Sequence, residues 1–123
     1  MPALLLVMTG GALGAGARYL ASGAALAWLG ATFPWGTLFV NLAGGMLMGV
    51  LAGSLVRTTA GEPWRLFLGV GVLGGFTTFS AFSLDTVTLV QRGQIVPAFG
   101  YVLLSVAGSI AALVAGLGLA RLA

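Results

Sequence analysis

Charged residues are so scarce in this chain that most of it cannot face water. Charged side chains make up 6% of the 123 residues and apolar side chains 59%, whereas about a quarter of the residues of a soluble domain are charged. A chain of this kind has too little polar surface for a water-facing exterior. The sequence therefore predicts an integral membrane protein that forms a single domain over residues 1–123.

The scarce polar residues also exclude several kinds of chemistry. The chain has no Cys and no His, which removes thiolate metal sites and the commonest general base. The two acidic residues are Glu62 and Asp85, too few for hydrolytic or metal-dependent catalysis. The five Arg are scattered along the chain, so nucleic acid is not an expected partner. We therefore do not expect an enzyme.

The apolar residues are grouped into stretches long enough to cross a bilayer. A spanning helix needs about 20 apolar residues. Charged residues, Pro and Gly divide the chain into four such segments, at about 3–29, 35–56, 64–90 and 97–121. Trp28, Trp35 and Trp64 lie near segment ends, as in interfacial aromatic belts. The predicted fold is an all-α membrane protein with four transmembrane helices.

The distribution of Arg does not give one clear orientation. Arg57, Arg65 and Arg121 would lie on one side of the membrane, and Arg92 with Arg18 on the other. Cytoplasmic loops normally carry a marked excess of positive residues. Two interpretations stay open at this point: an orientation that charge does not resolve, and a protein that inserts both ways and pairs antiparallel.

The third segment contains an unusual run, Gly74 to Ser83, which reads GGFTTFSAFS. Paired Gly followed by paired Thr favours helix poorly, so we expect helix 3 to be broken near the middle of the membrane. Unwound backbone carbonyls at such breaks can bind Na⁺. The edge of a phenyl ring is positive, so the Phe residues of this run could face an anion.

Neutral polar side chains dominate the predicted membrane interior. Tyr101, Ser105 and Ser109 are spaced four residues apart and share one helix face, with about 6 Å of rise per step. Asn41 adds an amide in the second segment. Each Ser could simply bond its own helix backbone, or the three hydroxyls could form a polar track. Neutral donors suit a small anion better than a cation, which usually requires embedded carboxylates. These residues do not identify the anion.

Three segments of the chain resemble the CrcB/Fluc family of fluoride channels. They are Gly74 to Ser83, the run GTLFVNLAG from Gly36 to Gly44, and the run GALGAGARY from Gly11 to Tyr19. The first is highly specific to that family. The similarity in length and in the number of membrane spans extends over the whole chain.

The resemblance implies a fluoride-selective channel in the plasma membrane that exports F⁻ and protects the cell from it. It implies an antiparallel, dual-topology homodimer with two pores and a structural Na⁺ at the dimer interface, held by the backbone carbonyls of Gly74 and Thr77. It places Arg18 at an aqueous vestibule. The residues that it assigns to the fluoride pathway are Asn41, Phe79, Phe82, Tyr101, Ser105 and Ser109. Phe76 and Glu62 receive no role.

Two other functions compete with this one. A dual-topology, proton-coupled drug exporter would also have four helices, but it would need a carboxylate in the first segment, which has none. A non-conducting accessory subunit would not need a helix break or a line of hydroxyls.

Arg18 and Asp85 both fall in the far half of the bilayer at 1.5 Å of rise per residue, and we expect them to neutralise each other.

Overall fold

The computed structural model describes residues 2–56 and 61–122, and nearly all of them are helical. Two long helices come first, α1 (Ala3–Leu29) and α2 (Trp35–Leu55). The third membrane segment comprises α3 (Gly61–Trp64), the π-helix η1 (Arg65–Leu73), α4 (Gly74–Phe76) and α5 (Phe79–Gln91), and α6 (Ile95–Leu122) follows. The described residues contain four helical segments long and apolar enough to cross a membrane, which confirms the four predicted spans.

The boundaries lie within a few residues of the predicted ones. The first helix ends before Gly30, whose positive φ of 81° is readily adopted only by glycine. Gly93 has a similar φ of 79° in the turn between α5 and α6. The last helix begins at Ile95, two residues earlier than expected, and so includes Pro97. Proline is tolerated there because the first turn of a helix has no intrahelical partner for its amides.

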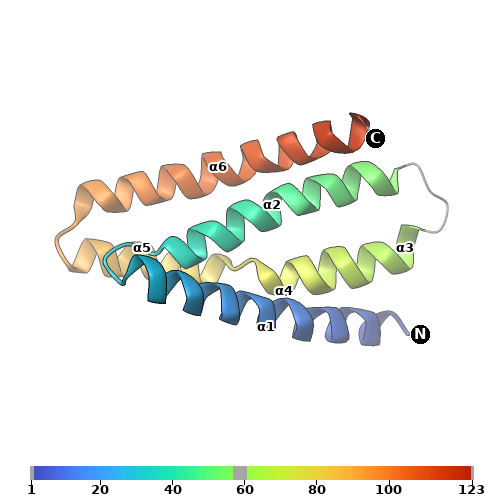
Figure 1. Ribbon diagram of the computed structural model, residues 1–123, viewed down its shortest axis with the longest axis horizontal. Coiled ribbons are helices and arrows are strands. Elements are labelled where there is room, and N and C mark those ends of the chain that lie inside the picture. Colours follow the sequence, from blue (N-terminus) through green and yellow to red (C-terminus); the bar gives the residue numbers. More distant parts are fainter. Residues whose placement is uncertain (1, 57–60, 123) are drawn as a thin grey trace.

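Close backbone contacts hold the helices together in two pairs. Along α2 and α6, a Cβ on Gly49 would clash with the Leu113 carbonyl, and one on Gly116 with the Met46 carbonyl. Along α1, a Cβ on Gly14 would clash with the Val72 carbonyl of η1. Small residues permit such approaches, which drive helix association in lipid. Figure 1 shows α6 beside α2, and α1 beside η1 and α4.

Large apolar side chains cover the outside of the helices rather than filling a broad core. Leu13, Val96 and Phe99 are each more than 60% exposed. The main buried cluster is small and consists of Leu38, Phe82, Leu89, Ala98 and Tyr101. This arrangement is stable when lipid or another protein chain covers the apolar surface.

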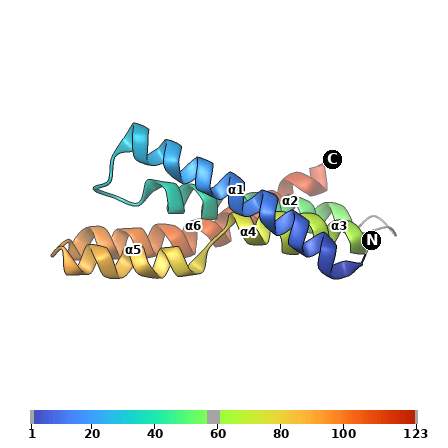
Figure 2. The same cartoon turned by 90° about the horizontal axis from the view of Figure 1, so that it is seen from below.

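Thr77 and Thr78 interrupt the third membrane segment. Their φ and ψ angles are −86° and 157° for Thr77, and −152° and 121° for Thr78, which are extended values. Figure 2 shows this two-residue connection between α4 and α5. The half before it packs against α1, and the half after it packs against α6. The third membrane segment therefore contacts α1 before the interruption and α6 after it.

Candidate functional site

The amide of Asn41 binds the extended backbone at Thr78. Its Oδ1 accepts a hydrogen bond from the Thr78 N–H at 2.8 Å, and its Nδ2 donates to the Thr78 carbonyl at 3.0 Å. This reciprocal pair resembles the pairing of one strand with another. It satisfies two backbone groups that would otherwise be unpaired in an apolar setting. Asn41 therefore fixes the position of the interruption relative to α2.

The side chain of Thr78 caps the helix that follows. Its Oγ1 accepts a hydrogen bond from the Ala81 N–H at 3.2 Å and shares another with the Ser80 hydroxyl at 3.2 Å. Threonine is a favoured N-cap because its oxygen pairs with one of the four free amides of the first turn. Sequence reasoning left Thr78 out of the site, although a Thr before a new helical run is the signal that could have identified it.

These contacts leave two backbone carbonyls without their helical donors. In a continuous helix, the N–H of Thr78 would donate to the Gly74 carbonyl, and that of Ala81 to the Thr77 carbonyl. Both N–H groups are bound elsewhere, to Asn41 and to the Thr78 hydroxyl. The carbonyls of Gly74 and Thr77 therefore lie at the interruption with acceptor capacity to spare. No cluster of three or more Asp, Glu, His or Cys side chains exists in the described part of the chain.

A pocket of about 390 Å³ brings together most of the residues that the sequence indicated. It lies between α2, the interruption, α5 and α6. The lining residues are Asn41, Gly44, Gly45, Thr77, Thr78, Phe79, Phe82, Ser105, Val106, Ser109 and Ile110. Apart from two glycines and two aliphatic side chains, the wall consists of an amide, hydroxyls and two phenyl rings. No charged side chain lines it.

The two phenyl rings of this pocket have different surroundings. The ring centroids of Phe79 and Phe82 lie 5.3 Å apart, with the planes inclined at 48°. Phe79 is 75% exposed, whereas Phe82 is only 8% exposed and belongs to the buried cluster. Phe79 therefore projects from the surface of the monomer, and Phe82 is held from behind by the Tyr101 ring at 5.3 Å.

The three aligned hydroxyls of α6 do not share one environment. Ser105 and Ser109 line the pocket, but Tyr101 does not. The Ser105 Oγ is buried and has no hydrogen-bond partner within the described ranges. Tyr101 is completely buried, and its hydroxyl donates to the Asp85 Oδ2 at 3.1 Å. On the face that the spacing of four predicted, two hydroxyls thus line the pocket, and the third is buried and bonds Asp85.

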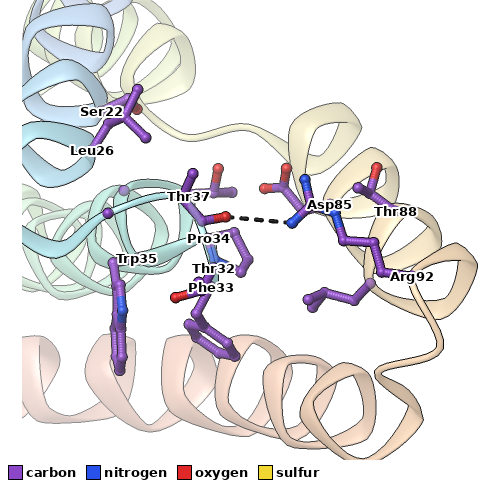
Figure 3. Close-up of a pocket in the computed structure, with 14 residues that line it drawn as sticks. Ser22, Leu26, Thr32, Phe33, Pro34, Trp35, Thr37, Asp85, Thr88 and Arg92 are labelled. Carbon is purple, nitrogen blue, oxygen red and sulfur yellow. Dashed lines mark hydrogen bonds between the residues drawn. The ribbon is translucent and has the colours of Figure 1, made fainter.

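Asp85 belongs to a second pocket, of about 240 Å³, at the end of the bundle near residues 30–37. Figure 3 shows Thr37, Asp85 and Arg92 around it. The Nη1 of Arg92 donates to the Ala31 carbonyl at 3.4 Å. This contact joins the turn after α5 to the turn after α1.

The predicted pairing of Arg18 with Asp85 is wrong. The Nε of Arg18 donates to the Gly75 carbonyl at 3.0 Å, and Asp85 instead accepts from Tyr101. Arg65 and Glu62 form an ion pair at 2.7 Å on the exposed surface. The prediction used the rise of a continuous helix. The interruption directs α5 against α6 instead of α1. Asp85, which lies on α5, is therefore not brought next to Arg18 on α1.

Comparison with known proteins decides the family. Residues 5–117 match the family model described as "CrcB-like protein, Camphor Resistance (CrcB)". The chain belongs to the CrcB family. This confirms the resemblance inferred from three short segments, and it makes the chain a multi-pass integral protein of the cell membrane.

Relatives of this CrcB protein cover nearly its whole length. A protein of Phenylobacterium zucineum is 58% identical over 123 residues, covering 98% of this chain and 97% of its own. A protein of Sphingopyxis alaskensis is 54% identical over 122 residues, with coverage of 98% and 97%. A protein of Mesorhizobium japonicum is 52% identical over 118 residues, with coverage of 96% and 95%. All three are named "Fluoride-specific ion channel FluC".

Proposed function

We propose that this CrcB protein is a fluoride-selective channel that lets F⁻ leave the cell passively and so limits fluoride toxicity. The printed names of its relatives support this substrate. The observation that carries the proposal is the uncharged pocket formed by Asn41, the interruption, the two Phe rings and the hydroxyls of α6. It offers hydrogen-bond donors and positive ring edges without a carboxylate to repel an anion.

The pocket has donors available to replace the water around a fluoride ion. The buried Ser105 hydroxyl has no partner among the described residues. An amide nitrogen carries two hydrogens, and Asn41 needs only one of them for the Thr78 carbonyl. A small ion that loses water requires such compensation, because burial of an unpaired charge is very costly. We assign Asn41, Ser105, Ser109 and the edges of Phe79 and Phe82 to the conduction pathway, with Tyr101 behind Phe82.

The proposed channel is an antiparallel homodimer of dual topology with two pores. The exposure of Phe79 supports it, since this ring would form only one wall of a pathway in a monomer. A second copy placed over the pocket would enclose the pathway. Twofold symmetry in the membrane plane would generate two equal pathways and is consistent with the nearly balanced distribution of Arg.

A structural Na⁺ at the dimer centre is part of this proposal. The donor set fits the ion, because the Gly74 and Thr77 carbonyls have lost their helical donors. Two subunits would contribute four such dipoles, and a cation between them would relieve their mutual repulsion. Carbonyl oxygens without carboxylates suit Na⁺ better than Ca²⁺ or Mg²⁺. When bound, the ion supplies a positive charge that favours an anion nearby.

The test of this function is fluoride efflux from liposomes that contain only the purified protein. We expect F⁻ to leave down its gradient when K⁺ and valinomycin balance the charge, and Cl⁻ to be retained. A Na⁺ gradient should not drive F⁻ uphill. Fluoride flux coupled to Na⁺ would make the protein a cotransporter, drug-dependent proton movement would make it an exporter, and no flux would favour an accessory subunit.

Replacing Ser105 with Ala should reduce fluoride flux several-fold without lowering stability. The hydroxyl is buried, and its one interaction, with the Tyr101 hydroxyl, does not meet hydrogen-bond geometry in the described structure. Its removal therefore breaks no hydrogen bond and eliminates an unsatisfied group that costs about 1–3 kcal/mol. The measurements are efflux and the melting temperature of the purified protein. Ser83→Ala is the matched control, because the Ser83 hydroxyl bonds its own helix at Phe79 and is absent from the pocket. A stability loss together with normal flux would show that Ser105 is structural only.

A further inference from the structure

Arg18 makes a contact that its expected place at a vestibule does not explain. Its Nε donates to the Gly75 carbonyl at 3.0 Å. This carbonyl lies between Gly74 and Thr77 in the chain, immediately before the extended residues. In a continuous helix it would accept from the Phe79 N–H, but Phe79 begins the next helix. Arg18 thus replaces a donor that the interruption takes away.

We propose that Arg18 is a positioning residue that ties α1 to the end of α4 and reserves the carbonyls of Gly74 and Thr77 for the cation. This inference rests on the proposed function. Three contacts at the interruption support this assignment. The Asn41 Oδ1 accepts the Thr78 N–H, which would otherwise bond the Gly74 carbonyl, and the Thr78 Oγ1 accepts the Ala81 N–H, which would otherwise bond the Thr77 carbonyl. Arg18 instead donates directly to the Gly75 carbonyl.

The close packing of α1 against α4 fixes the position from which Arg18 reaches the Gly75 carbonyl. A Cβ on Gly75 would lie 2.6 Å from the Gly11 carbonyl, so α1 and α4 touch through their backbones. Gly14, one turn before Arg18, is buried against Val72 and Phe76. Arg18 therefore extends from a helix that cannot shift easily, and its guanidinium holds the Gly75 carbonyl in a fixed direction. Because Arg18 uses one of the two lone pairs of this oxygen and places a positive charge beside it, the Gly75 carbonyl is a poorer ligand for the cation than the carbonyls of Gly74 and Thr77.

The side-chain chemistry of Gln and Met separates the hydrogen bond from the charge. The Nε2 of Gln occupies the same position along the side chain as the Nε of Arg, one bond beyond Cδ, so Arg18→Gln can keep the donor while losing the charge. Arg18→Met loses both. Arg18→Lys keeps the charge, but its single nitrogen lies one atom farther from the backbone.

The experiment measures the Na⁺ concentration that gives half-maximal thermal stabilisation of the purified protein, in a choline background of constant ionic strength. For Arg18→Met we expect this concentration to rise about tenfold, as for the loss of one hydrogen bond from a charged donor. Arg18→Gln should raise this concentration by only about threefold, since it keeps a donor but loses the charge that strengthens the bond. Arg92→Met is the matched control, because Arg92 also donates to a backbone carbonyl but lies away from the interruption.

The outcomes distinguish this inference from the proposed function. Equal impairment of Arg18→Gln and Arg18→Met would mean that charge matters rather than the bond to Gly75, and would overturn the inference. An unchanged Na⁺ dependence in Arg18→Met would also overturn it. If Arg18→Met does not assemble, Arg18→Lys replaces it. A Lys variant that needs no more Na⁺ for half-maximal stabilisation than the Gln variant would count against the inference.

Fluoride efflux from the unmodified protein tests the channel function separately. An unmodified protein that conducts fluoride but gains no stability from Na⁺ would remove the cation site and leave the channel intact.

Discussion

Replacing Phe79 with Ile is expected to reduce fluoride flux several-fold, up to about tenfold, while the dimer still assembles. Ile keeps much of the apolar volume but lacks the positive ring edge that we assign to the anion. Aromatic edge contacts are worth about 0.5–1.5 kcal/mol, and a loss of about 1.4 kcal/mol at the barrier slows passage tenfold. Efflux from liposomes measures the flux, and cross-linking of the membrane-embedded protein measures assembly.

Phe79 is a cleaner test than Phe82 because the two rings differ in burial. Phe79 is 75% exposed, so its replacement should cost the folded monomer little stability. Phe82 is 8% exposed and packs on Tyr101, so Phe82→Ile should reduce both flux and melting temperature. Phe99→Ile is the matched control, since Phe99 is 68% exposed on α6 and absent from the pocket. Normal conduction by both Phe79→Ile and Phe82→Ile would refute the role of the ring edges.

The membrane-spanning plan could be predicted from the sequence because it depends on composition over long stretches. A segment of apolar residues needs to satisfy its own backbone, and a helix is the only way for a single segment to do so in lipid. The four spans followed directly. The exact ends did not, because Pro97 is compatible with both a start at that residue and a start two residues earlier, at Ile95.

The sequence predicted where the helix is interrupted, but not which side chains bind the backbone groups at the interruption. The run of Gly and Thr indicated a weak helix, and the extended residues are the two Thr. The partners of the freed backbone groups come from other helices, so neither the bond of Asn41 to Thr78 nor that of Arg18 to Gly75 has a signal in residue spacing. The failed pairing of Arg18 with Asp85 has the same origin. Spacing along a helix predicts neighbours only while the helix continues.

Replacing Asn41 with Leu is expected to cause the largest loss of stability of any single substitution considered. Leu has a similar size but offers neither donor nor acceptor, so the N–H and the carbonyl of Thr78 would both lose their partners. Each unsatisfied buried group costs about 1–3 kcal/mol, which gives about 2–6 kcal/mol in total. The interruption would then lose its fixed position, and fluoride flux should be abolished. Thermal unfolding with and without Na⁺ and liposome efflux are the measurements.

Two further variants show whether Asn41 acts through this pairing or only through its polarity. Asn41→Asp keeps the oxygen that accepts from the Thr78 N–H but replaces the donor to the Thr78 carbonyl with a second oxygen. The two facing oxygens repel each other and the buried charge is costly, so Asn41→Asp should lose stability as Asn41→Leu does, although it remains polar. It should also block flux, because a carboxylate in the pocket repels an anion. Gln91→Leu removes an exposed amide at the end of α5 and should leave both properties unchanged. If Asn41→Leu proved as stable as the unmodified protein, water or another side chain would have to satisfy Thr78. The interruption would then be held without α2, and the site would depend on Arg18 and the Thr78 cap alone.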